Sequence, residues 1–478
     1  MRMLIGGQKA DAQDGKVIEI FNPATNELVD TVPSATKEDL EQVLNFAQQG
    51  KRIWATTPLH ERSRILMNYA DLVAKHQEEL AFLLCRETGK TIRNARTEID
   101  KIPHIFRGFV EKANHLYGLT IPDSFPGTEN DLIFTRREPL GVVLCVLPFN
   151  FPAVIFAYKV ASALAVGNAV IVKPPFDNPL TNMRLTELLL ESGVPGSVAQ
   201  IVTGDGPLVG KYLTTSSKIE AISFTGSTPV GIEILKEAAP HLHRVFLGLR
   251  GNDALIIAED ADLELSVAEA LTARITNAGQ ICIAAKRLVV HNSVKDVFAK
   301  LLIEKLNKLR IGDPLDPQTD LGCLINENAA REVENQVKHT IKQGASCVYG
   351  GKRFQRTFFE PTVLVDVTPE MDIAKDMEVF GPVFPIIGFQ TLEEAINICN
   401  SSVYGLNSGV ITRDLSKAMK VAMALECGGV IINGSGNYRL PEMAFGGYKM
   451  SGLGREGISC TLEALTQVKT IVLKKVLK

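Results

Sequence analysis

Residues 141–173 read GVVLCVLPFNFPAVIFAYKVASALAVGNAVIVK, with two short β-branched runs on either side of a longer apolar stretch. The runs at 141–149 and 168–173 have the length and composition of buried strands, whereas the stretch between them has the length and periodicity of a helix. A strand, a helix and a second strand in this order are typical of a parallel sheet that helices cover on both faces. This stretch therefore predicts an α/β fold.

The same alternation of strands and helices extends outward from this stretch. It continues with the amphipathic segment 180–192 and the apolar runs 198–204 and 219–226. A second series starts near Ala254, and its members are the strand ALIIA (254–258), a long helix from about Asp262 to Asn277 and the strand RLVVH (287–291). We expect two α/β halves that meet close to Gly248.

Length and charge exclude some classes of protein. A chain of 478 residues is too long for one ordinary core, so we expect two large domains with a smaller appendage. The formal net charge is −3 with both signs interspersed, and no basic stretch is interleaved with aromatic residues. A protein that binds the phosphate backbone of a nucleic acid usually has such a stretch, so nucleic acid is not an expected partner.

Hydropathy and cysteine usage predict a cytoplasmic enzyme without membrane contact. The N-terminal residues 1–15 lack the apolar run of a secretory signal, and no later segment reaches ~20 apolar residues without a charge. The eight cysteines have no paired spacing and form no CxxC or Cys/His cluster, so we expect reduced thiols and no metal site. With the exception of Cys282, we expect these thiols to be small, buried, apolar side chains.

Two strand-like segments, LIFTRREPL (132–140) and TQVKTIVLKK (466–475), fit neither half of the chain. They carry charges on one side, and they flank the first half from opposite ends of the sequence. Long unpaired strand edges are usually covered, often by another subunit. We therefore predict a homo-oligomer.

Three strand ends in the first half carry residues suited to a dinucleotide. Gly226 and Ser227 close one apolar strand and open a helix, where backbone N–H groups can bind a pyrophosphate. Lys173 ends a second strand, and the glycine-rich segment 204–210, which contains Gly206, ends a third. A Gly-Ser pair also serves as a plain turn in many α/β proteins. The occurrence of all three features at one sheet edge favours the cofactor interpretation.

Six motifs occur in one order along the chain. They are PFNFP (148–152), KPP (173–175), FTGST (224–228), NAGQIC (277–282), EVFGPV (378–383) and FGGYKMSGLGREG (445–457). Together they resemble the aldehyde dehydrogenase superfamily, and the resemblance runs from FNPATNELV near residue 21 to the last strand. It implies oxidation of a small aldehyde to its carboxylic acid, with NAD or NADP as the cofactor.

The resemblance also implies an aldehyde dehydrogenase-like α/β architecture. It consists of a Rossmann-like cofactor-binding domain (1–120 and 140–247), an α/β catalytic domain (248–445) and a small β oligomerisation extension (121–139 and 461–478). In the family this extension pairs subunits, so the expected assembly is a homodimer or a homotetramer.

Cys282 matches the nucleophile of the family, and Asn150 matches the residue that helps to bind the developing oxyanion. A thiolate adds to an aldehyde carbonyl to give a thiohemiacetal, whose alkoxide the Asn150 amide and the Cys282 backbone N–H can stabilise. Loss of hydride to the nicotinamide leaves a thioester. Glu378 and Phe380 match positions that hold the nicotinamide ribose. The full set of expected cofactor contacts is Pro148, Lys173, Gly206, Phe224, Gly226, Ser227, Glu378 and Phe380.

The segment RVFLGLRGND (244–253) departs from the family pattern. Gly248 stands where hydrolytic relatives carry a glutamate that activates water, and a positioned base of this kind contributes about 10²–10⁴-fold in rate. We favour activation of water by Glu378. The alternatives are transfer of the acyl group to coenzyme A and a catalytically weakened family member.

Arg250 is the second departure in this segment, because it replaces a glycine of the family pattern. One interpretation is a side chain that points to solvent or pairs with a carboxylate where the two halves meet. The other is a guanidinium close to Cys282 that lowers the pKa of the thiol or attracts an anionic substrate.

Phe176 bears on the choice of cofactor. It stands where many NAD-preferring relatives carry a glutamate that binds the adenosine ribose. Without that carboxylate a 2′-phosphate is not repelled, so NADP is predicted to be tolerated or preferred. NAD bound through backbone contacts is the alternative.

The loop 433–447 lies where relatives shape the substrate entrance. Its Tyr438 and Arg439 are the expected substrate-binding residues, because they resemble those of relatives that act on short aldehydes with an anionic or hydroxylated tail, such as lactaldehyde or a semialdehyde. Arginine suits such anions because it donates two hydrogen bonds at once. Alternatively, Arg439 is a solvated loop cation or a partner for Glu442.

Overall fold

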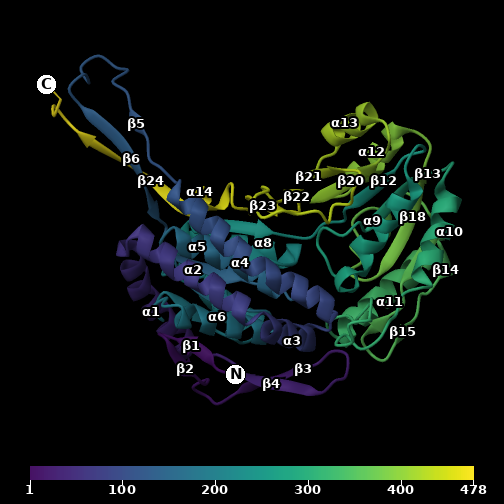
Figure 1. The fold of residues 1–478 in the computed structure, drawn as a ribbon, viewed down its shortest axis with the longest axis horizontal. Coiled ribbons are helices and arrows are strands. Elements are labelled where there is room, and N and C mark those ends of the chain that lie inside the picture. The colour runs from purple at the N-terminus through teal and green to yellow at the C-terminus, as the bar shows by residue number, and fades with distance from the viewer. Residues whose placement is uncertain (478) are drawn as a thin grey trace.

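The computed structural model describes residues 1–477 and contains two large, mainly parallel sheets flanked by helices (Figure 1). A three-stranded antiparallel sheet projects away from the body at the upper left of Figure 1. The predicted α/β fold is therefore confirmed.

The first sheet has eight strands in the order β2-β1-β9-β8-β7-β10-β11-β23, and its centre is parallel. These strands are β1 (Met3–Ile5), β2 (Gln8–Ala10), β7 (Val142–Val146), β8 (Ala169–Lys173), β9 (Ala199–Ile201), β10 (Ala221–Thr225), β11 (Arg244–Gly248) and β23 (Gly452–Leu453). The four strands predicted in this half are present, each shorter than expected. Helices bury both faces of the central strands. This explains why β7 is apolar throughout and why β8 is apolar up to its last residue, Lys173.

Eight helices cover this sheet. They are α1 (Lys37–Thr56), α2 (Leu59–Lys75), α3 (Gln77–Thr88), α4 (Ile92–Asn114), α5 (Pro152–Ala165), α6 (Leu180–Glu191), α7 (Lys211–Thr214) and α8 (Thr228–Ala238). Helix α1 packs against the central strands, whereas α2, α3 and α4 form an outer layer over α5 and α6 (Figure 1). The apolar core between these layers fixes the start of α5, next to Asn150.

The second sheet has the order β14-β17-β18-β13-β12-β20-β21, and every pair except β14 with β17 is parallel. Its strands are β12 (Ala254–Ile257), β13 (Arg287–His291), β14 (Ser346–Tyr349), β17 (Thr362–Val367), β18 (Val383–Phe389), β20 (Asn407–Ile411) and β21 (Gly429–Ile432). Its helices are α9 (Leu263–Ile275), α10 (Lys295–Leu306), α11 (Glu327–Lys342), α12 (Leu392–Asn400) and α13 (Leu415–Ala424). The predicted second series is present in the predicted order.

Short elements complete the chain. They are the hairpin of β3 (Val17–Phe21) and β4 (Leu28–Pro33), the pair β15 (Arg353–Phe354) and β16 (Phe358–Phe359), the pair β19 (Tyr404–Gly405) and β22 (Tyr448–Lys449), and helix α14 (Thr461–Ala464).

The chain passes from one large sheet to the other close to Gly248. Strand β11 ends at Gly248 and β12 begins at Ala254, so residues 249–253 cross between the sheets. The chain also returns, because β23 pairs antiparallel with β11. The motif 445–457 is therefore attached to both halves, and it closes one side of the seam.

The projecting sheet consists of β5 (Thr120–Ile121), β6 (Leu132–Pro139) and β24 (Thr466–Leu473). Strands β6 and β24 pair antiparallel along their whole length, from Thr466 opposite Pro139 to Leu473 opposite Leu132. The two segments that fitted neither half thus pair with each other. Several apolar side chains of β24 remain exposed, and the role of this sheet in subunit pairing stays a prediction.

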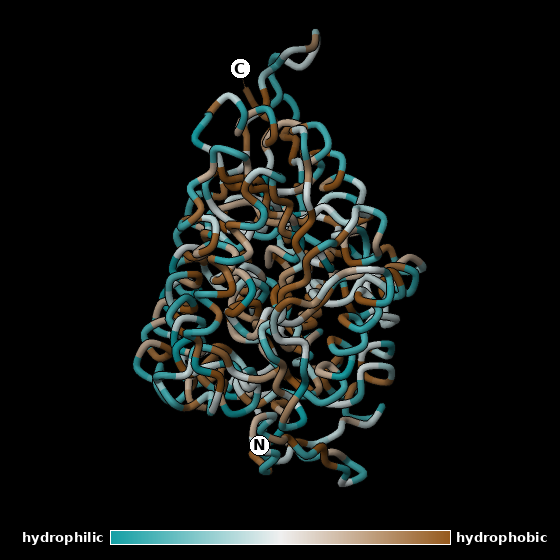
Figure 2. The backbone as a smooth tube through the Cα atoms, turned by 90° about the vertical axis from the view of Figure 1, so that its right-hand side faces the viewer, coloured by the Kyte–Doolittle hydropathy of each residue, from teal (hydrophilic) through white to brown (hydrophobic). Residues whose placement is uncertain are grey.

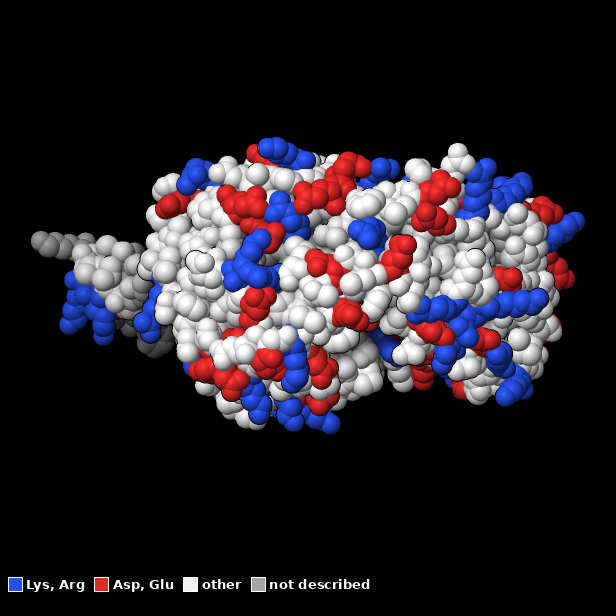
Figure 3. All heavy atoms as spheres, turned by 90° about the horizontal axis from the view of Figure 1, so that it is seen from below, with Lys and Arg blue, Asp and Glu red and all other residues white. Residues whose placement is uncertain are grey.

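The polarity of the surface agrees with the fold. In Figure 2, many apolar stretches of the backbone pass through the middle of the molecule, and many of the outer loops are polar. Acidic and basic side chains are interspersed on the face shown in Figure 3. Among residues 1–477 no helix combines the length and the apolarity that crossing a membrane requires.

The prediction that seven cysteines are buried is wrong in part. All eight cysteines are free thiols; Cys85, Cys145, Cys323 and Cys399 are buried, whereas Cys427 and Cys460 are only partly buried and Cys347 is exposed. Cys347 lies on β14, an edge strand of the second sheet. Most residues of this strand are exposed, so the alternation of side chains between the two faces of the sheet does not bury Cys347.

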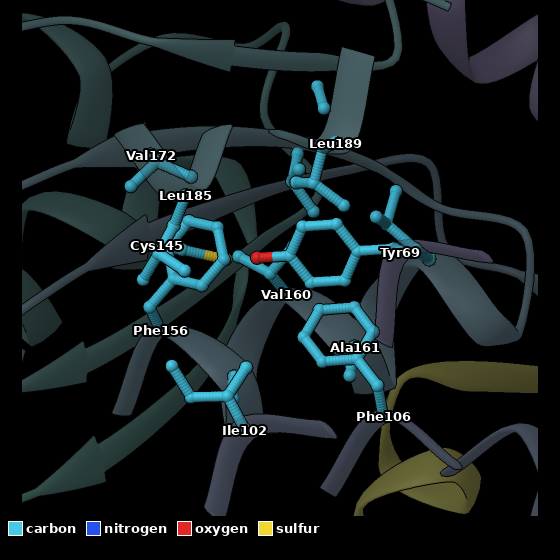
Figure 4. Packing of buried hydrophobic residues seen from close by; sticks show 14 of the residues in the cluster. Tyr69, Ile102, Phe106, Cys145, Phe156, Val160, Ala161, Val172, Leu185 and Leu189 are labelled. Carbon is cyan, nitrogen blue, oxygen red and sulfur yellow. The ribbon is translucent and has the colours of Figure 1, made fainter. Parts of the chain in front are cut away.

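A buried hydroxyl in the first core lacks a hydrogen-bond partner. The ring of Tyr69 packs beside Phe106 with ring centres 4.4 Å apart, and its hydroxyl points toward Phe156 and Cys145 (Figure 4). No group among the described residues bonds this hydroxyl, and burial raises the pKa of Tyr69 well above its usual value.

We expect Tyr69→Phe to stabilise the protein by about 1 kcal/mol, because it removes an unpaired buried polar group and keeps the ring. The melting temperature should rise by about 1–3 °C in differential scanning calorimetry. Tyr212→Phe is the matched control, since the Tyr212 hydroxyl donates to Glu41 at 3.2 Å, and it should not stabilise. A lower melting temperature for Tyr69→Phe would contradict the assignment.

Candidate active site

A cavity of about 1200 Å³ lies between the two large sheets, beside the loops that precede β13 and β18 of the second sheet and at the carboxyl ends of the parallel strands of the first sheet. This is the edge at which open α/β sheets bind ligands. The eight expected cofactor contacts all line it, namely Pro148, Lys173, Gly206, Phe224, Gly226, Ser227, Glu378 and Phe380. Cys282, Asn150 and Arg439 line the same cavity, so the structure brings the predicted nucleophile, amide and cation together.

The cavity wall at α8 suits a pyrophosphate. Ser227 is the N-cap of this helix, and its side chain makes no capping hydrogen bond. The first backbone N–H groups of the helix therefore face the cavity without a side-chain partner. At Gly206 a Cβ atom would meet nothing within 4 Å, so this loop is open to a ligand. The arrangement fits an anion at a helix N-terminus.

Lys173 is a buried cation with one weak partner. It is 7% exposed, and its Nζ donates to the Pro174 carbonyl at 3.1 Å. Burial lowers the pKa of this ammonium group to about 8. An ammonium group with free donors at the cavity wall fits the hydroxyl groups of a nucleotide ribose. Phe176, which lines the same wall, is half-exposed.

The loop that carries Cys282 has an unusual backbone. Helix α9 ends at Ile275, and Asn277, Ala278 and Gly279 then adopt φ values of 50°, 52° and 75°. A Cβ at Gly279 would lie 2.3 Å from the Gly381 carbonyl oxygen, so glycine is required there. Residues held in the left-handed region cost energy that the surrounding structure must offset, and they cluster at functional sites. This turn directs Cys282 into the cavity.

Cys282 is partly buried, and burial raises the pKa of its thiol to about 11. Lys286 opposes this shift, and its Nζ donates to the Cys282 carbonyl at 2.5 Å. Asp253 is also close, but burial raises the pKa of its carboxyl group to about 7, so it carries only part of a charge at neutral pH. The sequence analysis did not predict a role for Lys286. Its position four residues after Cys282 could have indicated a cation close to the thiol.

Asn150 faces the nucleophile loop. Its side-chain Nδ2 donates to the Gln280 carbonyl at 2.9 Å, and Asn277 Nδ2 donates to the Asn150 carbonyl at 2.8 Å. One N–H of the Asn150 amide has no partner among the described residues and is available for a ligand. The amide and the thiol thus sit across one small volume, as oxyanion stabilisation requires.

Gly248 provides no carboxylate at the position where the family pattern has glutamate. A Cβ there would lie 3.2 Å from Thr225 Oγ1, so a side chain has limited room beside Thr225. The side chain of Arg250 is partly exposed, and its Nε lies 3.4 Å from Glu378 Oε2. Lys286 Nζ lies 3.2 Å from Glu378 Oε1. Arg250 therefore pairs with a carboxylate at the seam, the first of its two interpretations. Lys286 and Arg439 are the cations that act to lower the pKa of the thiol.

Arg439 is held in a well-defined buried position. Its guanidinium lies between the rings of Tyr158 and Phe445, 4.1 and 3.9 Å from their centres, and Nη2 donates to Glu456 at 2.7 Å. Its Nε is buried without a partner among the described residues. Lys159 also pairs with Glu456, at 3.3 Å. The expected alternatives, a solvated cation or a partner for Glu442, are wrong, because the motif 445–457 brings Glu456 back over the loop.

Tyr438 does not line the cavity. Its side chain is 55% exposed and takes no part in the wall that Arg439 helps to form. The aromatic residues beside the cation are Tyr158 on α5 and Phe445. The prediction of Tyr438 as a substrate contact is therefore not supported by its position.

Comparison with known proteins identifies the family. The model of the aldehyde dehydrogenase family matches residues 10–471. A lactaldehyde dehydrogenase of Methanococcus aeolicus is 36% identical over 474 residues, which cover 98% of this chain and 99% of that protein. A 3-sulfolactaldehyde dehydrogenase of Priestia aryabhattai is 38% identical over 457 residues, with 95% and 94% covered. The crystal structure of an NADP-dependent enzyme of E. coli superposes with a TM-score of 0.96, at 36% identity and with 99% and 98% of the two chains covered.

The fold, the cavity at the sheet edges and these similarities agree. The chain belongs to the aldehyde dehydrogenase family. It is an NAD(P)-dependent aldehyde dehydrogenase, an oxidoreductase that acts on an aldehyde.

Because burial favours the neutral thiol, alkylation of Cys282 should depend steeply on pH. Between about pH 7 and pH 10 the rate with iodoacetamide should rise about tenfold per pH unit, since only the thiolate reacts. Peptide mass spectrometry would follow Cys282, with the exposed Cys347 as internal control. Lys286→Met should slow the reaction further at each pH. A plateau of the Cys282 rate below about pH 8 would contradict the raised pKa.

Proposed function

We propose that this enzyme oxidises a small aldehyde with an anionic tail to its carboxylic acid, with Cys282 as the nucleophile. The observation that carries the proposal is the charged group opposite the thiol. Lys159 and Arg439 share the single carboxylate of Glu456, so this buried group has a net charge of about +1. An anionic substrate group would complete it.

The position of Cys282 supports the following sequence of steps. Its thiolate sulfur attacks the aldehyde carbonyl carbon, and the π electrons of the carbonyl move to oxygen. The Asn150 amide and the Cys282 backbone N–H stabilise the alkoxide of this thiohemiacetal. The alkoxide re-forms the carbonyl as hydride leaves, and the acyl group remains on sulfur as a thioester.

NAD or NADP, when bound, supplies the hydride acceptor. The residues of the chain hold it in place: the N-terminus of α8 with Gly226 suits the pyrophosphate, and Lys173 suits the adenosine ribose. Glu378 and Phe380 line the cavity on the side of the thiol, where the nicotinamide ribose has to lie. The half-exposed Phe176 supports acceptance of NADP, because no carboxylate stands there to repel a 2′-phosphate.

Release of the acid requires water to attack the thioester carbonyl, after which the thiolate leaves. With glycine at position 248, we propose that Glu378, a carboxylate of the cavity wall that acts electrostatically on Cys282, accepts the proton of this water. Each of its oxygens lies close to a cation, Arg250 or Lys286, so both oxygens are engaged in ion pairs. We therefore expect deacylation to be slow relative to hydride transfer.

The missing carboxylate at Gly248 also supports a second candidate function. A thioester that water hydrolyses slowly can be transferred to a thiol such as coenzyme A, which needs no water-activating base of that kind. The carboxylic acid and the coenzyme A thioester are distinct products, so one assay separates the two functions.

Turnover with a panel of short aldehydes and both cofactors should produce reduced nicotinamide without coenzyme A. Cys282→Ala should abolish it, because no other thiol lines the cavity among the described residues. Rapid mixing should show a burst of reduced cofactor before the steady state, since deacylation is expected to be slow. Turnover that requires coenzyme A would favour the second candidate, and full activity of Cys282→Ala would exclude both.

Arg439→Met should lower kcat/KM for succinate semialdehyde by about 10–100-fold relative to a neutral aldehyde of the same length. The reason is the loss of a charge-assisted hydrogen bond worth about 1.5–3 kcal/mol. Arg455→Met is the matched control, because Arg455 is a nearby cation of the motif 445–457 and does not line the cavity. The ratio between the two substrates is measured, so general damage cancels. An unchanged ratio would show that Arg439 is purely structural.

A further inference from the structure

A buried ion pair lies directly behind Asn150, and the steps above give it no role. Lys90 precedes α4 and Glu98 lies within it, and their side chains are 0% and 1% exposed. Lys90 Nζ donates to Glu98 Oε2 and, at 2.8 Å, to the backbone carbonyl of Asn150. The ammonium group also lies 4.5 Å from the centre of the Phe151 ring.

The other oxygen of Glu98 caps helix α5. Glu98 Oε1 accepts hydrogen bonds from Ala153 N at 2.9 Å and Val154 N at 3.1 Å, whereas the N-cap residue Phe151 offers no side-chain cap. A carboxylate at a helix N-terminus is favoured by the helix dipole and by the free N–H groups. Helix α5 begins two residues after Asn150, so this cap fixes the turn from which Asn150 projects.

The same outer helix reaches the nucleophile loop. Asn94 on α4 accepts a hydrogen bond from Asn277 N at 2.9 Å, and Asn277 Nδ2 donates to the Asn150 carbonyl at 2.8 Å. The Asn150 carbonyl therefore has two donors, one from each half of the molecule. The side-chain amide of Asn150 donates a hydrogen bond to the backbone carbonyl of Gln280, two residues before Cys282.

Stability alone is a poor explanation for this pair. Burying two charges costs desolvation energy, and a buried ion pair is often no more stabilising than apolar residues of the same volume. Its geometry instead restrains one backbone group that the reaction needs. A displacement of about 1 Å in a catalytic group can cost about 10²-fold in rate.

We propose that Lys90 and Glu98 are positioning residues that hold Asn150 where its amide meets the alkoxide formed on Cys282. The inference rests on the proposed function of Asn150. Lys90 fixes the Asn150 carbonyl and Glu98 fixes the following turn, so the side chain starts from a defined Cα position. Neither residue touches the substrate.

The test uses the full-length enzyme and the double variant Lys90→Met with Glu98→Gln. Changing both residues avoids leaving a lone buried charge, which would threaten folding, and the amide oxygen of the introduced glutamine can still cap α5. We expect kcat to fall by about 10–100-fold while KM for the cofactor changes by less than about twofold. Asn150→Ala alone should lower kcat by about 10²–10³-fold.

The decisive comparison places the same double variant in the Asn150→Ala background. Once the amide is gone its position no longer matters, so we expect less than about a threefold further loss of kcat. A pair that only supports the fold would lower kcat by the same factor in both backgrounds, and this result would overturn the inference.

Glu87→Gln is the matched control. Glu87 on α3 caps helix α6 in the same way, through Leu180 N at 2.7 Å and Thr181 N at 2.9 Å, and it makes no contact with Asn150. It should change the melting temperature as much as the double variant and leave kcat unaltered. If Asn150→Ala itself retains full kcat, the proposed oxyanion role fails. If Asn150→Ala is slow and the double variant is as fast as Glu87→Gln, only the positioning inference fails.

Discussion

The hydrogen bond from the Asn150 amide to the Gln280 carbonyl joins the two halves of the enzyme at its reacting centre. Asn150 follows β7 of the first sheet, and Gln280 belongs to the loop that leaves α9 beside the second sheet. The amide and the thiol can face each other only when the carboxyl edge of the first sheet is docked against the loop that precedes β13 of the second sheet. The left-handed turn at Asn277 and Ala278 and the contact of Gly279 with Gly381 are consequences of this constraint.

Charge is distributed in the same pattern on both sides of the thiol. On one side Lys286 and Arg250 share Glu378, and on the other side Lys159 and Arg439 share Glu456. Each group has two cations for one carboxylate. Under the proposed function, the group that contains Arg439 suits an anionic substrate tail.

Several site residues could be predicted because short motifs keep neighbouring atoms together. NAGQIC places a thiol after a glycine turn, and FTGST places an uncapped helix start after a strand, so Cys282 and Ser227 were found in the sequence. Lys286 was missed, although it lies in the next turn of the same loop. Tyr438 was expected to bind substrate because the loop 433–447 resembles that of relatives, whereas packing places Tyr158 of α5 against the guanidinium of Arg439.

The sequence by itself determined the alternation of strands and helices, the crossing near Gly248 and the small residues around Cys282, because each of these depends on periodicity or on the backbone freedom of a few adjacent residues. Only the tertiary structure decided which charges are paired: Arg439 with Glu456, Arg250 with Glu378, and Lys90 with Glu98 behind Asn150. The partners in each pair are not neighbours in the sequence. Coulomb and hydrogen-bond energies depend on distances of a few ångströms, and those distances exist only after the sheets and the outer helices have packed.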